Sequence, residues 1–243
     1  MQPRVKEAAA AQRKWTVGMA MERVERDDGL AGVEMIGPKG PVRVLCLLVH
    51  GRGQVPADML RMVAEHVDVA GVRWVMPVAD GKSWYKAKAV DPLTEATRGQ
   101  MAEGLAMFDR LIAAERAAHP GVPVVAAGFS QGACMVTEWV LRGAAVDGLA
   151  VFTGCRVGAY GTGEPVRPLG GLPVYAVCGD QDSWIPLDAF LGMCGVLARA
   201  GARLRADVMP GRPHDICPAE VAELARMLAA LAEGRPVMAD GIA

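Results

Sequence analysis

One serine in this chain lies where a protein could use it as a nucleophile. The segment GFSQG brackets Ser130 with a glycine on either side. An apolar run at 122–127 precedes it and a helical pattern at 131–142 follows, which predicts a strand-to-helix turn. Such a turn exposes the hydroxyl above a sheet and needs small flanking residues. The chain's only other serines are Ser83 and Ser183, so we interpret Ser130 as a nucleophile rather than as part of a plain glycine turn.

A serine hydroxyl needs a base to take its proton, and histidine suits that role near neutral pH. The chain has four histidines. His66 falls inside a helical pattern, His119 ends a helix before Pro-Gly, and His50 ends the first buried apolar run. His214, in PGRPHD, follows both Ser130 and a predicted strand. Because the order Ser, Asp, His is that of one large hydrolase class, we predict His214 as the base.

The third member of a serine triad is a carboxylate that orients the imidazole. The segment GDQD follows a predicted strand at 174–178 and offers Asp180 and Asp182. We predict Asp182 for this role and interpret Asp180 as a turn residue. Asp215 adjoins His214 in the chain and is therefore poorly placed to face the far ring nitrogen. We interpret it as a surface carboxylate or one that lies on the approach to a helix.

Acyl transfer also needs N–H groups that stabilise an oxyanion. One comes from the residue after the nucleophile, here Gln131, at the positive end of a helix. The other comes from a loop after an early strand, and HGRGQ at 50–54 supplies glycines that let the backbone approach a substrate closely. We predict the backbone N–H groups of Arg52 and Gln131 as the pair. Because only the N–H is used, we expect Gln131→Ala to retain much of the activity.

Short apolar runs alternate with helical patterns along the rest of the chain. We expect helices at 57–70, 97–119, 131–142, 187–200 and 218–231, and strands at 42–49, 72–76, 122–127, 149–153, 174–178 and 203–209. This alternation predicts an α/β fold, with a mostly parallel sheet covered by helices on both faces. Residues 15–36 are expected to add one or two antiparallel edge strands around a turn at 27–29. No insertion is long enough for a large lid domain.

Composition narrows the function classes further. The 243 residues are 52% hydrophobic, which permits a sizeable core, and 26 basic residues balance 27 acidic ones, which argues against a nucleic-acid partner. We find no membrane span and no secretory signal, so the default location is cytoplasmic. The six cysteines are unclustered, which predicts buried free thiols and no metal site. We expect residues 1–14 to be a leader and 15–243 to form a single domain.

Five segments together resemble the phospholipase/carboxylesterase family of α/β-hydrolases, which includes the acyl-protein thioesterases. They are LLVHGRG, ADGKSWY, GFSQGACM, GDQDSWIP and PGRPHDI, and the resemblance spans about residues 42–231. It implies the α/β-hydrolase fold and hydrolysis of carboxylic esters, thioesters or lysophospholipids through an acyl-serine intermediate. It places the triad on Ser130, Asp182 and His214 and implies no cofactor.

Three aromatic residues, Trp84, Tyr85 and Trp184, fall in loops at the catalytic end. We predict that they line the substrate pocket, the alternative being hydrophobic anchors over turns. A nearby lysine cluster is expected to be solvated, with attraction of anionic substrates as the alternative: Lys82, Lys86 and Lys88.

Two other functions would suit the same residues. One is a ligand-binding protein that keeps a hydrolase scaffold without turnover, and the other is an amidase or peptidase that uses the same triad. The sequence leaves the natural substrate, the acyl chain length and the oligomeric state open, with a homodimer among the alternatives.

Overall fold

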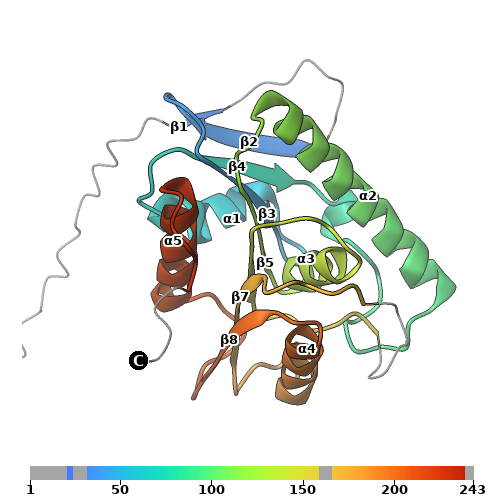
Figure 1. Cartoon of the computed structure of the whole chain (residues 1–243). Helices are drawn as coiled ribbons and strands as arrows, with labels where there is room; N and C mark the ends of the chain where they lie inside the picture. The colour runs from blue at the N-terminus through green and yellow to red at the C-terminus, as the bar shows by residue number, and fades with distance from the viewer. Residues whose placement is uncertain (1–20, 24–31, 159–165, 239–243) are drawn as a thin grey trace, which may run out of the picture.

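One eight-stranded sheet organises the computed structural model, which describes residues 21–23, 32–158 and 166–238 (Figure 1). The strand order is β1-β2-β4-β3-β5-β6-β7-β8. The strands are β1 (Met21–Arg23), β2 (Val33–Pro38), β3 (Val44–Val49), β4 (Val72–Pro77), β5 (Val124–Phe129), β6 (Gly148–Phe152), β7 (Pro173–Gly179) and β8 (Arg203–Met209). The predicted leader at 1–14 and the turn at 27–29 lie outside the described residues.

The sheet is mostly parallel. All pairs from β4 through β3, β5, β6 and β7 to β8 are parallel, whereas β1 pairs antiparallel with β2 and β2 antiparallel with β4. The antiparallel edge expected from residues 15–36 is therefore present.

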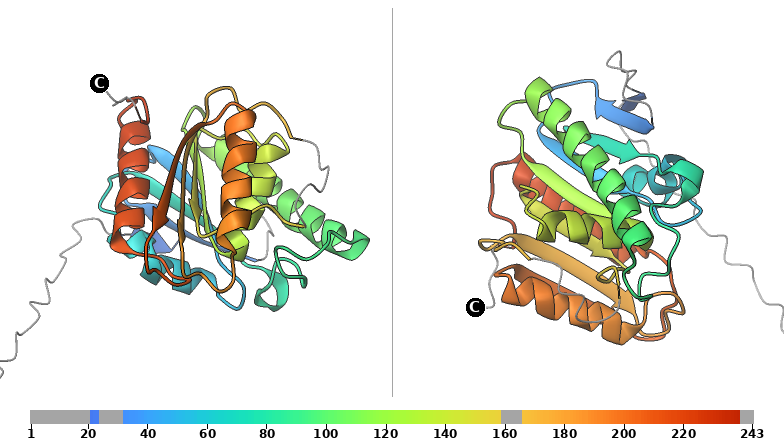
Figure 2. Two further views of the ribbon diagram at one scale, coloured as in Figure 1. Left: turned by 90° about the horizontal axis from the view of Figure 1, so that it is seen from below. Right: turned by 90° about the vertical axis from the view of Figure 1, so that its right-hand side faces the viewer.

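Helices cover both faces of the sheet, as the alternation in the sequence predicts (Figure 2). Residues of α2, α3 and α4 pack into the core on one face, and residues of α1 and α5 pack into the core on the other. Their bounds are α1 (Pro56–Met62), α2 (Glu95–Ala118), α3 (Gln131–Leu141), α4 (Leu187–Arg199) and α5 (Pro218–Ala232).

The sequence of β3, VLCLLV, shows why the sheet must be covered twice. Every residue of this strand is fully buried. Leu45, Leu47 and Val49 face the core under α2, α3 and α4. The alternate residues of the strand face the core under α1 and α5. A continuous apolar run of this kind is stable only where no face of the strand meets water.

One predicted helix is wrong in its extent. The apolar spacing at 57–70 predicts a single helix, but α1 ends at Met62 and a 3₁₀ turn follows at Ala64–His66. Val63, with φ −129° and ψ −65°, leaves the helical region between them. The chain then has to turn back into β4, and Gly71 makes that turn at φ +81°. Periodicity alone does not separate a helix from a helical turn followed by buried loop residues.

Parallel strands bring their carboxyl ends to one edge of the sheet, and the candidate residues gather there. His50 follows β3, Ser130 follows β5, Asp182 comes just after β7, and His214 lies on the loop after β8. This is the edge at which open α/β sheets place their ligand sites.

The six cysteines are free thiols, five of them buried and Cys217 half-buried, in agreement with the sequence. None of the helices in the described ranges is long and apolar enough to cross a bilayer.

Candidate active site

Ser130 lies on a sharp elbow between β5 and α3. Its backbone adopts φ 55° and ψ −121°, a region that residues other than glycine rarely occupy. The strained turn is held by its own hydrogen bonds. The Ser130 N–H donates to the Phe152 carbonyl oxygen at 3.0 Å, and its carbonyl accepts from the Cys134 N–H at 3.0 Å. Strain at one residue persists only where neighbours fix it in this way.

The two glycines of GFSQG are there because backbone passes close to both of them. A Cβ on Gly132 would collide with the carbonyl oxygens of Val49 and His50 at the end of β3, the latter at 2.6 Å. A Cβ on Gly128 would meet the carbonyl carbon of Gly132 at 2.6 Å. The elbow therefore forms only where neither position carries a side chain.

His214 links the serine to a carboxylate. Its Nε2 lies 2.8 Å from Ser130 Oγ, and its Nδ1 lies 2.7 Å from Asp182 Oδ2. The imidazole also packs against the Phe129 ring, with centroids 5.0 Å apart. Residues separated in the sequence thus form one hydrogen-bonded row, the arrangement that acyl transfer requires of nucleophile, base and orienting acid.

The Asp182 side chain is fully buried and uses both oxygens. Oδ2 faces His214, while Oδ1 accepts the N–H groups of Trp184 and Ile185, each at 2.8 Å. Burial opposes ionisation of this carboxyl, but the hydrogen bonds from His214 and from the two backbone groups outweigh it and lower its pKa below the ordinary 3.8. An ionised acceptor fixes the proton of His214 on Nδ1 and leaves Nε2 free to accept from Ser130.

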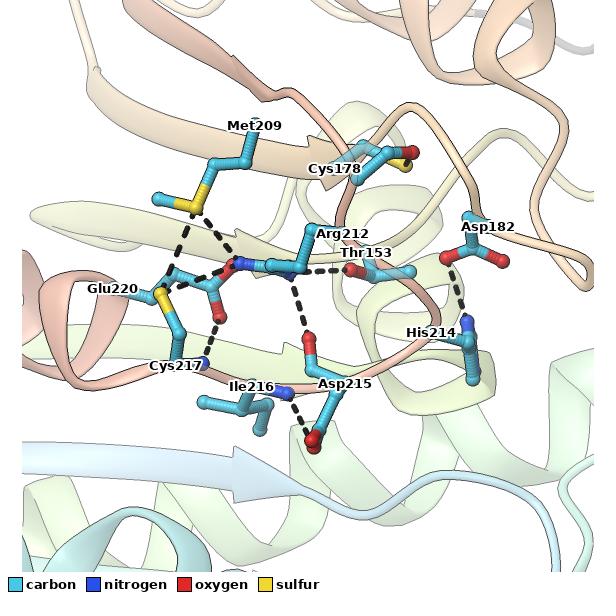
Figure 3. A network of polar contacts seen from close by, with 11 residues as sticks. Thr153, Cys178, Asp182, Met209, Arg212, His214, Asp215, Ile216, Cys217 and Glu220 are labelled. Atoms are coloured by element: carbon cyan, nitrogen blue, oxygen red, sulfur yellow. Dashed lines mark hydrogen bonds and ion pairs between the residues drawn. The ribbon is translucent and has the colours of Figure 1, made fainter. Parts of the chain in front are cut away.

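The other two aspartates have different partners, as the sequence suggests. Asp180 Oδ1 accepts the Gly211 N–H at 2.6 Å, which ties together the two loops that carry Asp182 and His214. Asp215 Oδ1 accepts the Ile216 N–H at 2.7 Å, and its carboxylate points away from the imidazole (Figure 3).

The loop after β3 comes close to Ser130. A Cβ on Gly51 would lie 3.2 Å from the Ser130 Cβ. The loop is held by bonds from the Gly51 N–H to Gln54 Oε1 at 2.8 Å and from the Gly53 N–H to the Lys82 carbonyl at 2.7 Å. Among the described residues, no acceptor is found for the backbone N–H of Arg52 or of Gln131. The two N–H groups stay the predicted oxyanion donors.

His50 supports this loop and is itself fully buried. Its Nε2 accepts the Ala79 N–H at 3.1 Å, so Nδ1 carries the proton and donates to the Gly51 carbonyl at 2.7 Å. Burial lowers the pKa of His50 below its ordinary 6.5, which favours this neutral form. From the sequence alone, this histidine was assigned no role beyond ending the strand.

The side chains of Arg52 and Gln131 both form hydrogen bonds with the backbone of one loop, residues 83–87. The Arg52 guanidinium donates to the carbonyl oxygens of Tyr85 at 3.1 Å, Lys86 at 2.9 Å and Ala87. The buried Gln131 amide donates to the Tyr85 carbonyl at 2.7 Å and accepts the Trp84 N–H at 2.9 Å. The expectation that Gln131 acts through its N–H alone is therefore incomplete.

The three predicted pocket aromatics divide between core and surface. Trp84 and Tyr85 are only 5% and 1% exposed, and they belong to the core under α2 and α3. Trp84 packs edge-on against Phe108, and its indole N–H donates to the His50 carbonyl at 2.8 Å. These two side chains therefore anchor the loop in the core, and their place in a substrate pocket stays a prediction. Trp184 is 65% exposed, with its ring centroid 6.2 Å from that of His214.

Two cavities flank these loops. One of about 570 Å³ lies between the Arg52 side chain, the loop before Trp84 and helix α2, and Trp84 contributes to its wall. Another of about 530 Å³ lies between the segment that follows α1, with its 3₁₀ turn, and the start of α5, next to Asp215. Within the described ranges, no group of three or more His, Cys, Asp or Glu side chains could hold a metal ion.

We expect Gly132→Ala to lower the free energy of unfolding by about 3 kcal/mol, because the added methyl meets rigid backbone carbonyls. Gly99→Ala is the matched control. Gly99 lies in α2 with nothing within 4 Å of an added Cβ, so alanine should raise the free energy of unfolding by about 1 kcal/mol. Urea unfolding measures both, and equal effects would contradict the close approach at Gly132.

We expect Asp182→Asn to lower the free energy of unfolding by about 2 kcal/mol at neutral pH, because charged hydrogen bonds are lost. Since the folded pKa lies below 3.8, the ionised group contributes stability that is present above pH 3.8 and is lost as the pH falls through the folded pKa. The difference from wild type should therefore shrink at acid pH. Urea unfolding over a pH series tests this, and a difference that does not change with pH would contradict it.

We expect Gln131→Ala to destabilise the fold by about 2 kcal/mol, because the Trp84 N–H and the Tyr85 carbonyl lose their partners in a buried place. Gln100→Ala is the control. Gln100 Oε1 accepts the Lys86 N–H at 3.0 Å in the same loop, but this bond is exposed, so water replaces it at little cost. Thermal and urea unfolding distinguish the two, and similar small effects would show that the Gln131 side chain does not hold the loop.

Comparisons with known protein families and with solved structures point to the same family. A model of the phospholipase/carboxylesterase family matches residues 30–232. A phospholipase/carboxylesterase structure from Dyadobacter fermentans DSM 18053 is 27% identical, with a TM-score of 0.68 over 79% of this chain and 93% of that one.

Two further structures, both below 25% identity, show the likeness of fold. Acyl-protein thioesterase 2 from Zea mays is 16% identical, with a TM-score of 0.67 over 82% of this chain and 98% of that one. Esterase PE8 is 20% identical, with a TM-score of 0.66 over 79% of this chain and 94% of that one. Among curated proteins the sequence has no significant match.

Proposed function

The chain belongs to the phospholipase/carboxylesterase family of ester hydrolases, and we propose that it cleaves carboxylic esters and thioesters through an acyl-serine intermediate. In this proposal Ser130 is the nucleophile, His214 the general base and Asp182 the orienting carboxylate. The observation that carries the proposal is the unbroken row from Ser130 Oγ to His214 Nε2 at 2.8 Å and from His214 Nδ1 to Asp182 Oδ2 at 2.7 Å.

Acylation follows from this geometry. His214 Nε2 takes the proton of Ser130 as Oγ bonds to the acyl carbon, and Asp182 stabilises the imidazolium. The carbonyl oxygen gains negative charge, and the backbone N–H groups of Arg52 and Gln131 are its donors in this proposal. The N-terminus of α3 adds a favourable dipole. The tetrahedral intermediate then breaks its bond to the alcohol or thiol, which leaves with the proton from His214.

Deacylation repeats the same steps with water. His214 removes a proton from a water molecule, whose oxygen attacks the acyl carbon. The second tetrahedral intermediate releases the carboxylic acid, and the proton returns to Ser130 Oγ. The two half-reactions need no group beyond these side chains, the N–H donors and water.

The exposed Trp184 beside His214 supports an open site that takes small and medium acyl groups. Among the structural neighbours, one is a thioesterase on acyl-proteins and another an esterase by name, which is why both bond types belong in the test. Free thiols at all six cysteines favour a reducing, cytoplasmic location.

The test is hydrolysis of p-nitrophenyl esters and of thioesters with matched acetyl, butyryl and octanoyl groups. We expect Ser130→Ala to lower kcat by about 10⁴-fold or more and to abolish labelling by a fluorophosphonate, because no other group takes its place.

Ser183→Ala is the matched control, since Ser183 is an exposed serine beside Asp182 and should be replaced without loss of activity. Full activity of Ser130→Ala would overturn the proposal. Turnover of anilides as fast as esters would point instead to an amidase. Tight binding without turnover or labelling would point to a ligand-binding protein.

A further inference from the structure

Arg212 lies two residues before His214, and its side chain joins the loop after β8 to the end of β6 and to the start of α5. Figure 3 shows its side chain between the end of β6, the loop after β8 and the start of α5. The side chain is only 11% exposed. The proposed mechanism assigns it no chemistry, so its burial beside the candidate base needs another explanation.

The guanidinium donates in three directions. It forms an ion pair with Glu220 on α5, donates to Thr153 Oγ1 at 3.3 Å, and donates to the Asp215 carbonyl oxygen at 2.6 Å. Because Arg212 and Asp215 flank His214 on both sides, the last bond closes a short loop around the base. The guanidinium also contacts two sulfur atoms. Met209 Sδ lies 3.0 Å from it and Cys217 Sγ lies 3.5 Å from it.

The Arg212 backbone holds the other loop of the site. Its carbonyl oxygen accepts the Gln181 N–H at 3.1 Å, one residue before Asp182. The approach is so close that a Cβ on Gly179 would meet the Arg212 carbonyl carbon at 2.7 Å. One residue thus fixes the base loop through its side chain and the carboxylate loop through its backbone.

The partners of the guanidinium are themselves fixed. The Glu220 side chain is fully buried, and its second oxygen accepts the Cys217 N–H at 3.1 Å at the start of α5. Burial raises the pKa of Glu220 to about 6, so the carboxylate is ionised at neutral pH. Thr153 has φ 54°, an uncommon conformation for a β-branched residue. Only the planar fork of arginine, with its five N–H donors, reaches three such acceptors together.

We infer that Arg212, anchored on Glu220, is a positioning residue that holds the His214 loop in register with Asp182 and Ser130. This inference rests on the proposed function only for its kinetic consequence, because the alignment of His214 with Asp182 can be observed without turnover. Misplacement of a base by about 1 Å costs about 100-fold in rate, which is the scale of effect expected here.

The test uses Arg212→Met, Arg212→Lys and the double variant Arg212→Met/Glu220→Gln in the full chain. Removing the guanidinium alone leaves a buried carboxyl without its cation, which destabilises the fold. The double variant removes that charge, while the glutamine oxygen still accepts the Cys217 N–H. The double variant therefore separates misplacement of the His214 loop from a loss of overall stability. The variant Arg212→Lys keeps the positive charge but not the planar guanidinium group.

Arg205→Met is the matched control. Arg205 on β8 pairs with Glu223 on α5 at 2.8 Å, so it also links this edge of the sheet to α5, but its side chain is 51% exposed. Among the described residues its other contacts are Asp207 and the Tyr175 ring, which lie in neither loop of the site. Its removal should leave kcat, KM and the His214 signal described next unchanged.

Three readouts are compared: thermal unfolding, kcat and KM with a p-nitrophenyl ester, and the far-downfield proton resonance of the His214 Nδ1–H bound to Asp182. We expect the double variant to unfold at a temperature near that of wild type, to lose kcat by about 100-fold with little change in KM, and to lose or broaden the proton resonance. For Arg212→Lys we expect a kcat and a proton resonance intermediate between those of the double variant and those of wild type.

A folded double variant with the resonance and kcat of wild type would overturn the inference. If wild type hydrolyses no ester and its resonance is nevertheless lost in the double variant, the proposed function fails while the positioning role stands. If Ser130→Ala is inactive and every Arg212 variant matches wild type, the positioning role alone fails.

Discussion

The close approach of Gly132 to the end of β3 is the constraint on which the site depends. Because the carbonyl oxygens of Val49 and His50 lie against this glycine, α3 starts directly behind the first core strand. The helix can begin there only if Ser130 takes a positive φ, which turns its side chain out of the sheet. The same contact brings the loop after β3 beside the serine, so one backbone packing arrangement positions both the candidate nucleophile and the candidate oxyanion donors.

The rest of the site is built from loops that are fastened to one another. The segments after β7 and β8 exchange hydrogen bonds through Asp180 with Gly211 and through Gln181 with Arg212. These bonds set the distance between Asp182 and His214 before either side chain is considered. Hydrogen-bonded loops on a rigid parallel sheet keep such distances short without a covalent link, which is what a preorganised site requires.

The loop at 83–87 illustrates how the same residues serve structure and chemistry. Arg52 and Gln131, the predicted oxyanion donors, hold this loop with their side chains, and Trp84 anchors it in the core. The loop is therefore fixed in place rather than free to close over a substrate. Trp184 is the one predicted pocket aromatic that remains open to solvent.

The sequence by itself determined the α/β order, the parallel strands and the candidate chemistry, since apolar runs, glycines and the positions of Ser130, Asp182 and His214 relative to strands are local properties. It could not determine where α1 ends, because helical spacing also fits a 3₁₀ turn. Only the tertiary structure decided that Trp84 and Tyr85 are buried and that Arg212 forms an ion pair with Glu220. Burial and long-range hydrogen bonds depend on which elements meet, and one sequence read along its length does not contain those distances.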